Sequence, residues 1–294
     1  MITVIGSINL DLIARTMHLP KPGETVSGSD FQSAPGGKGA NQALAAARAG
    51  ARVRMVGAIG NDAFGGESMA LLDEGGVDLS LVRKAEVATG IALITVEASG
   101  ENVIVVVPGA NGTVSLGDVK AAGLSGGHLL LQHEIPLATV GAALKAAREN
   151  GTISILNIAP WRDEAADLLP LADIVIANET EFDLAASRLK LEGADRESRM
   201  ADFAAKTGRT VIVTLGADGL CAATPQEAFA MPAYPVKPVD TVGAGDTFCG
   251  YLAAGLDMGL ALKAACRQAA IAASLACLKP GAQPAIPFAD ELPT

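Results

Sequence analysis

The stretch GANQALAAARAGARVRMVGAIG, residues 39–60, joins an alanine-rich run to a β-branched one. Residues 39–51 favour a helix, because alanine and leucine are strong helix formers. Residues 53–60 predict a short buried strand. A second apolar run, ITVIGSI at residues 2–8, precedes this pair. The N-terminal part therefore predicts a strand, a helix and a second strand parallel to the first.

The same alternation continues along the 294 residues. Short apolar runs recur between helical stretches at residues 129–132, 152–157, 173–178 and 210–216. Strands that are apolar almost throughout are typical of a parallel sheet that helices cover on both faces. We therefore expect an α/β fold with a central, mostly parallel sheet. Because no repeat or obvious linker divides the chain, we expect a single domain over residues 1–294.

Two regions, residues 11–32 and 88–111, break this alternation. The second predicts a β-hairpin, because apolar runs flank the turn ASGEN at residues 98–102. Neither region holds a helical pattern between its strands. We expect a small separate β-sheet from residues 10–34 and 89–109, approximately.

The composition excludes several classes of protein. The formal net charge of −10 argues against a nucleic-acid-binding protein, which needs a basic face. The cysteines lack CxxC spacing, so we expect reduced core residues at Cys221, Cys249, Cys266 and Cys277. The histidines lack metal-ligand spacing, so we expect structural or surface roles for His18, His128 and His133.

The chain shows no pattern of a membrane or secreted protein. Its first residues lack a basic region, and Asp11 interrupts the apolar run. The most apolar long segment, residues 261–278, contains Lys263 and Arg267 and does not fit a membrane span. We therefore expect a cytoplasmic protein that does not bind membranes.

The stretch DTVGAGDTFCG, residues 240–250, predicts an anion site. Gly243, Ala244 and Gly245 let backbone N–H groups converge at the positive end of a helix. Asp246 is then placed to accept a proton from a hydroxyl that attacks a phosphoryl group. On its own, the stretch fits equally well an aspartate N-cap after a flexible loop. The chain lacks the P-loop motif and the third glycine of a dinucleotide fingerprint, so the phosphate site is of another kind.

Two other stretches carry polar groups suited to a small polyol. Gly37 permits close approach of a ligand, and Lys38 and Asn41 offer donors near a helix start. The strand period places Asn9 and Asp11 on one face at the carboxyl end of an apolar strand, where ligands bind in open α/β sheets. Taken singly, a glycine turn and a solvated strand end explain these stretches as well.

Six motifs occur in an order that resembles the ribokinase-like (PfkB) family of carbohydrate kinases. They cover nearly the whole chain and read GSINLDL, PGETV, GGKGANQA, NETE, TLGADG and DTVGAGDTFCG. The resemblance implies a three-layer fold with a small β lid. It also implies ATP-dependent phosphorylation of the 5-hydroxyl of D-ribose, with Mg²⁺ bound with ATP.

The resemblance assigns roles to individual residues. It makes Asp246 the general base and forms an anion hole from Gly243, Ala244 and Gly245. The sugar-binding positions are Asp246 together with Asn9, Asp11, Gly37, Lys38, Asn41 and Glu134. The nucleotide-binding positions are Asn178, Glu181, Thr214, Gly216, Gly219 and Gly245, and Glu181 would contact Mg²⁺ indirectly. Without the resemblance, Asn178 and Glu181 fit a helix capping box and TLGADG fits a tight turn.

The resemblance also implies activation by K⁺. The monovalent-cation site would use loop carbonyls of Asp240, Val242, Ala276, Lys279 and Gly281. Ala285 stands where the family often has a hydroxyl side chain, so one ligand is missing. Ala270 stands where a polar residue often lies near adenine.

Other functions remain open from the residues. Another acceptor (2-deoxyribose, fructose or adenosine) fits the same fold, although the lid strands offer only Phe31 to stack on a base. A non-catalytic sugar-binding sensor is the alternative from a different class. The apolar segment NVIVVVP, residues 102–108, predicts an exposed strand edge and hence a homodimer through the lid.

Overall fold

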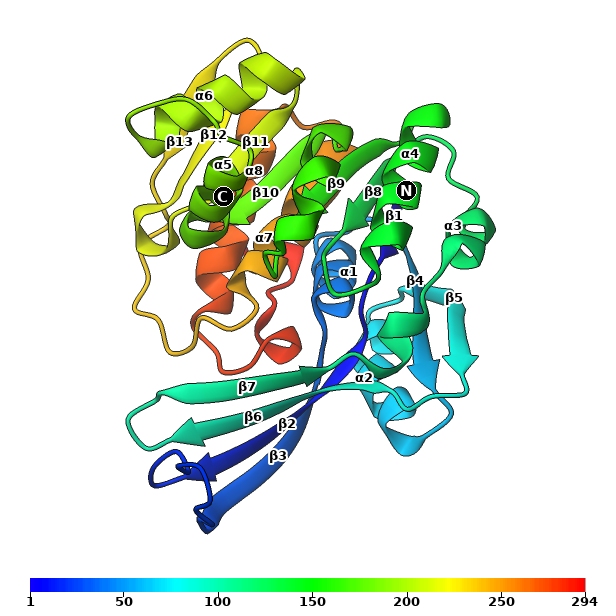
Figure 1. The fold of residues 1–294 in the computed structure, drawn as a ribbon, viewed down its shortest axis with the longest axis vertical. Helices are drawn as coiled ribbons and strands as arrows, with labels where there is room; N and C mark the ends of the chain where they lie inside the picture. Colours follow the sequence, from blue (N-terminus) through cyan, green and yellow to red (C-terminus); the bar gives the residue numbers. More distant parts are fainter. Residues whose placement is uncertain (294) are drawn as a thin grey trace.

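The computed structural model describes residues 1–293, and its core is a nine-stranded sheet (Figure 1). The strand order is β13-β12-β11-β10-β9-β8-β1-β4-β5. All neighbouring strands are parallel except β12 and β13, which extend one edge as antiparallel strands. The strands are β1 (Ile2–Ile5), β4 (Val53–Gly60), β5 (Asp78–Ala85), β8 (His128–Leu131), β9 (Ile153–Asn157), β10 (Ile174–Asn178), β11 (Thr210–Thr214), β12 (Leu220–Ala223) and β13 (Ala228–Met231).

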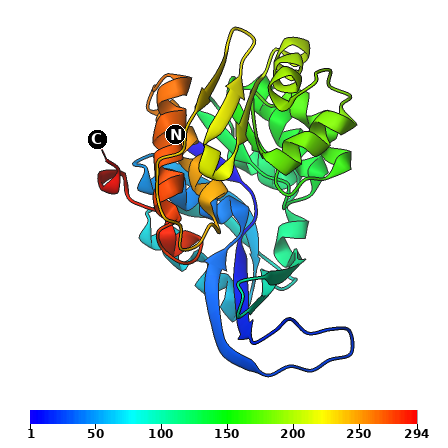
Figure 2. The same ribbon diagram turned by 90° about the vertical axis from the view of Figure 1, so that its left-hand side faces the viewer.

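Helices cover both faces of this sheet, as the apolar strands predicted (Figure 2). One face packs against α1 (Lys38–Arg48), α7 (Ala244–Asp257) and α8 (Leu262–Ala276). The other face packs against α3 (Leu116–Ala122), α4 (Leu137–Glu149), α5 (Glu179–Arg188) and α6 (Arg196–Thr207). Helix α2 (Ala63–Glu74) packs beside α1 and β4. Val4 and Ile5 of β1 enter opposite cores, which is the two-residue period of a strand buried on both faces.

A separate four-stranded sheet lies below the main sheet in Figure 1. Its order is β3-β2-β6-β7, from β3 (Gly28–Gly36), β2 (Asn9–Thr16), β6 (Gly90–Glu97) and β7 (Asn102–Val107). The hairpin expected around residues 98–102 is confirmed, because β6 and β7 pair antiparallel across it. Strand β7 is an edge strand, and every residue in it is exposed.

The expectation that Asn9 and Asp11 lie at the carboxyl end of the first apolar strand is wrong. Strand β1 ends at Ile5, residues 6–8 belong to neither strand, and Asn9 starts β2 in the small sheet. Gly6, directly after β1, is closely packed: a Cβ there would lie 2.9 Å from the Cα of Gly39 at the start of α1. Asn9 and Asp11 therefore lie where the chain passes from one sheet to the other.

Three of the four cysteines are buried as expected, whereas Cys277 is only partly buried. It directly follows α8 and lines the edge of the main cavity, so its description as a core residue was wrong. Within residues 1–293, no helix combines the length and the apolar character needed to cross a bilayer.

Candidate active site

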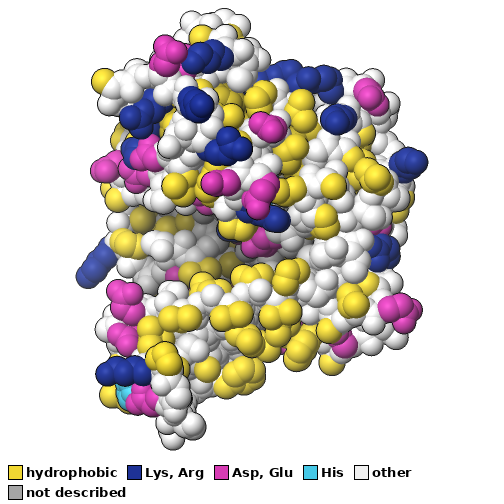
Figure 3. Space-filling model, viewed as in Figure 1, with side chains coloured by type: hydrophobic (Ala, Val, Ile, Leu, Met, Phe, Trp, Pro, Cys, Tyr) yellow, Lys and Arg dark blue, Asp and Glu magenta, His cyan; other side chains and the backbone are white. Residues whose placement is uncertain are grey.

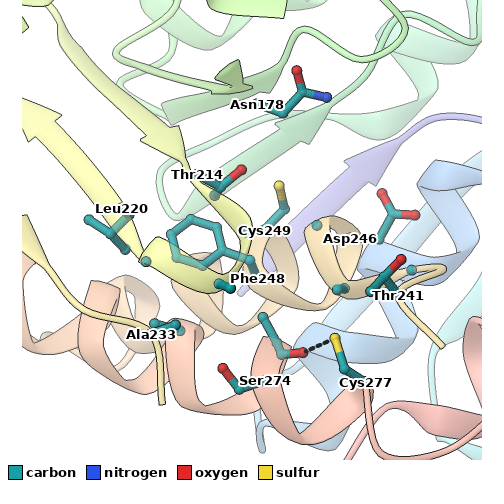
Figure 4. Close-up of a pocket in the computed structure, with 18 of the residues that line it drawn as sticks. Asn178, Thr214, Leu220, Ala233, Thr241, Asp246, Phe248, Cys249, Ser274 and Cys277 are labelled. Carbon is teal, nitrogen blue, oxygen red and sulfur yellow. Dashed lines mark hydrogen bonds between the residues drawn. The ribbon is translucent and has the colours of Figure 1, made fainter. Parts of the chain in front are cut away.

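A cavity of about 560 Å³ opens at the carboxyl ends of β9, β10 and β11. The space-filling view shows the surface hollowed between the main body and the small sheet (Figure 3). In Figure 4, Asp246 and Thr241 lie at one end of the cavity, and Leu220 and Ala233 lie at the other. The Asp246 end is lined by charged groups, and the Leu220 end is mostly apolar.

Helix α7 begins at the anion turn. Its N-cap is Gly243, whose φ of 77° is in the left-handed region that favours glycine. An added Cβ there would lie 2.8 Å from the Cα of Ala282. The first-turn N–H groups of Ala244, Gly245 and Asp246 precede the point where intrahelical bonds begin. The N-cap alternative for Asp246 is wrong, since Asp246 is the third residue inside the helix.

The carboxylate of Asp246 is buried and is held from helix α1. Its Oδ2 accepts a hydrogen bond from Asn41 Nδ2 at 2.9 Å, and its Oδ1 accepts one from Gln42 Nε2 at 2.8 Å. The side chain is only 6% exposed. Its two oxygens are therefore fixed in direction. Asn41 Oδ1 is buried and has no hydrogen-bond partner among the described residues.

Lys38, the first residue of α1, supplies a cation beside this carboxylate. The negative charge of Asp246 is the main cause that raises the pKa of the Lys38 ammonium, and Glu134 and Glu181 add to it. Glu134 Oε2 accepts the backbone N–H of Lys38 at 3.0 Å and the hydroxyl of Ser7 at 2.6 Å. The start of α1 is thus tied to the loop after β8.

Asp11 completes a group of three carboxyls with Glu134 and Asp246. Burial, followed by the charges of Glu134 and Asp246, raises the pKa of Asp11 to about 7. Asn9 lies two residues earlier, and its Oδ1 accepts a hydrogen bond from Asn111 Nδ2 at 2.7 Å. Gly37 has a φ of 88°, and a Cβ added to it would lie 2.7 Å from the backbone N of Asn9. The residues expected to bind a sugar therefore lie together.

The residues expected to bind a nucleotide line the cavity, whereas of the residues expected to bind a sugar only Lys38 and Asp246 line it. Asn178 and Glu181 form a capping box at α5, with Asn178 N to Glu181 Oε2 at 2.9 Å and Glu181 N to Asn178 Oδ1 at 2.8 Å. The capping interpretation is confirmed, yet both residues also line the cavity. Burial raises the pKa of Glu181, and the Lys38 ammonium partly opposes this shift. Thr214, Gly216 and Gly219 border the cavity at the tight turn after β11, as the turn interpretation expected.

The segments expected to hold a monovalent cation lie against each other. Asp240 Oδ1 accepts the N–H of Val242 at 3.0 Å, and its Oδ2 accepts the N–H of Gly281 at 2.8 Å. The N–H groups of Val239 and Asp240 both bond to the carbonyl of Cys277. Among residues 1–293, no three His, Cys, Asp or Glu side chains group as ligands of a metal ion. A cation here would depend on backbone oxygens.

The histidines lie outside this arrangement. His18 contacts Glu24 at the surface, and His128 bonds to Asp257 at 2.9 Å. His133 is buried, and burial lowers its pKa to about 4. A neutral, buried ring agrees with a structural role.

The sequence interpretation missed four polar residues beside the site: Ser7, Gln42, Asn111 and Gln132. Gln42 is next to Asn41 in the motif GGKGANQA, and Gln132 lies two residues before Glu134, which is the only signal that could have indicated them. Asn111 gives no such signal, because it lies 102 residues from Asn9 in the chain.

Comparison with known proteins identifies the family. The profile of the pfkB family carbohydrate kinases matches residues 1–289. The chain belongs to the pfkB family of carbohydrate kinases. The ribokinase of Haemophilus influenzae is 37% identical over 297 residues, covering 99% of this chain and 96% of that protein. The family resemblance inferred from the motifs is thereby confirmed, and the protein is a sugar kinase.

Two solved structures of pfkB kinases have the same fold. The ribokinase of Thermotoga maritima matches with a TM-score of 0.91 and 33% identity, over 99% of this chain and 97% of that one. The ribokinase of Arabidopsis thaliana, solved with ribose and ATP, matches with a TM-score of 0.88 and 34% identity, over 98% of this chain and 96% of that one. The expected three-layer α/β fold is confirmed.

Proposed function

We propose that this enzyme transfers the γ-phosphoryl group of ATP to the 5-hydroxyl of D-ribose, giving D-ribose 5-phosphate and ADP. One observation carries the proposal: a buried carboxylate, Asp246, lies in the first turn of α7 and beside Lys38 at the charged end of the cavity. The relatives named above are ribokinases, and one of them was solved with ribose and ATP.

Asp246 acts as the general base. Because Asn41 and Gln42 bind its two oxygens, the carboxylate keeps a fixed direction toward the acceptor hydroxyl. As it takes the hydroxyl proton, the sugar oxygen attacks the γ-phosphorus and the bond to the β-phosphate oxygen of ATP breaks. The N–H groups of Gly243, Ala244 and Gly245 stabilise the charge on the transferring group at the positive end of α7.

The sugar is held by hydrogen bonds from both sheets. When ionised, Asp11 accepts hydrogen bonds from sugar hydroxyls. The unpaired Oδ1 of Asn41 accepts a further hydrogen bond from the sugar. Lys38 donates to a sugar oxygen and offsets the charge of the carboxylates, while Asn9, Gly37 and Glu134 complete the contact surface. Such a site discriminates between sugars by single hydroxyl contacts.

ATP lies along the rest of the cavity, with its base at the apolar end near Leu220 and its phosphates toward Lys38. Mg²⁺ bound with ATP neutralises phosphate charge. Asn178 and Glu181 fit this ion, since Mg²⁺ keeps several waters and needs few direct protein ligands. Thr214, Gly216 and Gly219 border the nucleotide.

A K⁺ site beside the anion turn is a further part of the proposal. Asp240 ties the loop before α7 to the loop after α8, which brings together the segments of the expected ligands. These are the carbonyls of Asp240, Val242, Ala276, Lys279 and Gly281. Ala285 is buried and supplies no hydroxyl, so the site would have one ligand fewer.

The chain forms a single domain with the small sheet as a lid, and it dimerises through that lid. Strand β7 offers unpaired backbone groups along one edge, and its residues are exposed, including Val103, Val105 and Val107. An apolar edge of this kind favours pairing with a second copy. The lid excludes water from the phosphoryl group.

The acceptor is tested by ADP release with ATP and Mg²⁺ on D-ribose, 2-deoxyribose, D-fructose and adenosine, each with K⁺ or Na⁺. We expect D-ribose to give the highest kcat/KM, with K⁺ above Na⁺. Turnover confined to another acceptor would overturn the substrate but keep the mechanism. No ADP release with any of them would support a sugar-binding sensor.

A further inference from the structure

We propose that Gln42 and Gln132 are positioning residues that hold the Asp246 carboxylate in its reactive direction. The inference rests on the proposed role of Asp246 as the base. Both glutamines are fully buried, with 0% exposure, and neither lines the cavity. Their hydrogen-bonded connection to the cavity runs through Asp246, which lines it.

The three side chains form one hydrogen-bonded chain from three different elements. Gln132, directly after β8, donates its Nε2 to Gln42 Oε1 at 2.6 Å. Gln42, in α1, donates its Nε2 to Asp246 Oδ1 at 2.8 Å. This series of side chains ends at Gln132, whose amide lies against Gly6. Any Cβ on Gly6 would overlap that amide. Residues 42, 132 and 246 thus form a linear relay, named here the amide chain.

Chemistry fixes the direction of the amide chain. An ionised carboxylate can only accept hydrogen bonds, so Gln42 must turn its NH₂ group toward Asp246. The carbonyl of Gln42 then faces Gln132, which must also present its NH₂ group. If the Gln42 amide rotated by half a turn, its oxygen would face the carboxylate and repel it. The bond from Gln132 prevents that rotation.

The arrangement carries a stability penalty that a purely structural role does not explain. Gln132 Oε1 is buried without a hydrogen-bond partner among the described residues. An unsatisfied buried acceptor is unfavourable, whereas apolar replacement of both members of a buried polar pair is often neutral or stabilising. The amide chain therefore orients Asp246 even though its unsatisfied acceptor lowers the stability of the fold.

The test compares Gln42→Leu, Gln132→Leu and the double variant by steady-state kinetics and thermal unfolding. We expect Gln42→Leu to lower kcat about 10- to 100-fold, the effect of losing one hydrogen bond to a charged group. KM for sugar and for ATP should stay unchanged. Gln132→Leu should lower kcat less, and in the Gln42→Leu background it should have no further effect. The double variant should keep the wild-type Tm.

A matched control removes a buried polar group elsewhere. Thr139 is buried, and its hydroxyl donates to the carbonyl of Val114 at 2.8 Å, away from the cavity. Thr139→Val should lower Tm and leave kcat unchanged. This is the opposite of the result expected for the double variant of the amide chain.

The Asp246→Ala background separates this inference from the proposed function. There, Gln42→Leu should not lower the residual turnover further, because the group through which it acts is absent. An equal loss in both backgrounds, or wild-type kcat in folded Gln42→Leu, would overturn the positioning role. If Gln42→Leu does not fold, wild-type kcat in Gln132→Leu would overturn it instead. Normal turnover of Asp246→Ala would overturn the proposed function itself.

Discussion

Asp11 provides a prediction in which stability and function oppose each other. Burial, with the charges of Glu134 and Asp246, raises the pKa of this carboxyl from 3.8 to about 7 in the folded protein. The folded state therefore holds the proton more tightly than the unfolded state. The stability contribution is fully present below about pH 4 and is lost as the pH rises toward 7. The side chain of Asp11→Asn has the same shape but does not titrate, so this variant does not lose stability in this way as the pH rises.

The magnitude follows from the shift. A difference of about 3 pKa units corresponds to about 4 kcal/mol in total, and the part lost between about pH 5 and pH 8 is about 2 to 3 kcal/mol. Between these two pH values, the unfolding free energy of the ligand-free wild type should therefore fall by that amount relative to the unfolding free energy of ligand-free Asp11→Asn. For a chain of this size, the gap in Tm should grow by about 5 °C.

The assay is thermal unfolding of both proteins at the two pH values. Asp195→Asn serves as the control: its pKa is lowered by hydrogen bonds from Ser198 at the start of α6, so both pH values lie above the pKa and its gap should not grow. In turnover, Asp11→Asn should raise KM for the sugar at least about tenfold, since it loses charged hydrogen bonds. A Tm gap for Asp11→Asn that does not change with pH would refute the assignment of burial and carboxylate repulsion at this site.

Three further predictions follow from the anion turn, the cation loop and the lid. Gly243→Ala should lower both Tm and kcat, because the φ of 77° and the 2.8 Å approach of Ala282 leave no room for a Cβ. The control Gly245→Ala should keep the wild-type Tm, because nothing lies within 4 Å of an added Cβ there. Equal Tm values for the two variants would contradict this prediction. Asp240→Ala should abolish any preference of turnover for K⁺ over Na⁺, as it releases the N–H groups of Val242 and Gly281; a retained preference would place the cation elsewhere. Val105→Glu on exposed β7 should convert the proposed dimer to a monomer in sedimentation at micromolar concentration, and a monomeric wild type would refute the lid interface.

The sequence predicted the main sheet well because its strands are buried on both faces. Apolar runs such as residues 152–157 and 173–178 are buried in the core, where their side chains avoid water. The helical segments between such runs return the chain to the same end of the sheet, so consecutive strands are parallel. The small sheet was also predictable in part, since β2 pairs locally with β3 and β6 pairs locally with β7, but the pairing of β2 with β6 joins distant segments. Strand order was not, because it depends on which helix covers which face.

The break between β1 and β2 shows where a local pattern fails. The strand-like pattern continues through residues 2–12, yet β1 ends at Ile5, and Gly6 after it lies against Gly39. That contact joins residues 33 positions apart and has no local signature. The burial of Asp246 against α1 is another such case, since Asn41 and Gln42 reach it across more than 200 residues.

The candidate site was predicted in its residues more than in its geometry. Motif residues such as Lys38 and Glu134 contact each other, and their roles in binding a ligand stay predictions. The group of three carboxyls and the amide chain were not foreseen, because each is assembled from different elements. The sequence also could not tell an N-cap from an internal helix position for Asp246, which depends on where α7 starts.

The most direct test of the central claim is the turnover of D-ribose by Asp246→Asn with saturating ATP and Mg²⁺. If the carboxylate takes the hydroxyl proton, kcat of the folded Asp246→Asn enzyme should fall by about 10² to 10⁴-fold. A folded Asp246→Asn enzyme with near-normal kcat would contradict the account, because the group that accepts the proton would then lie elsewhere.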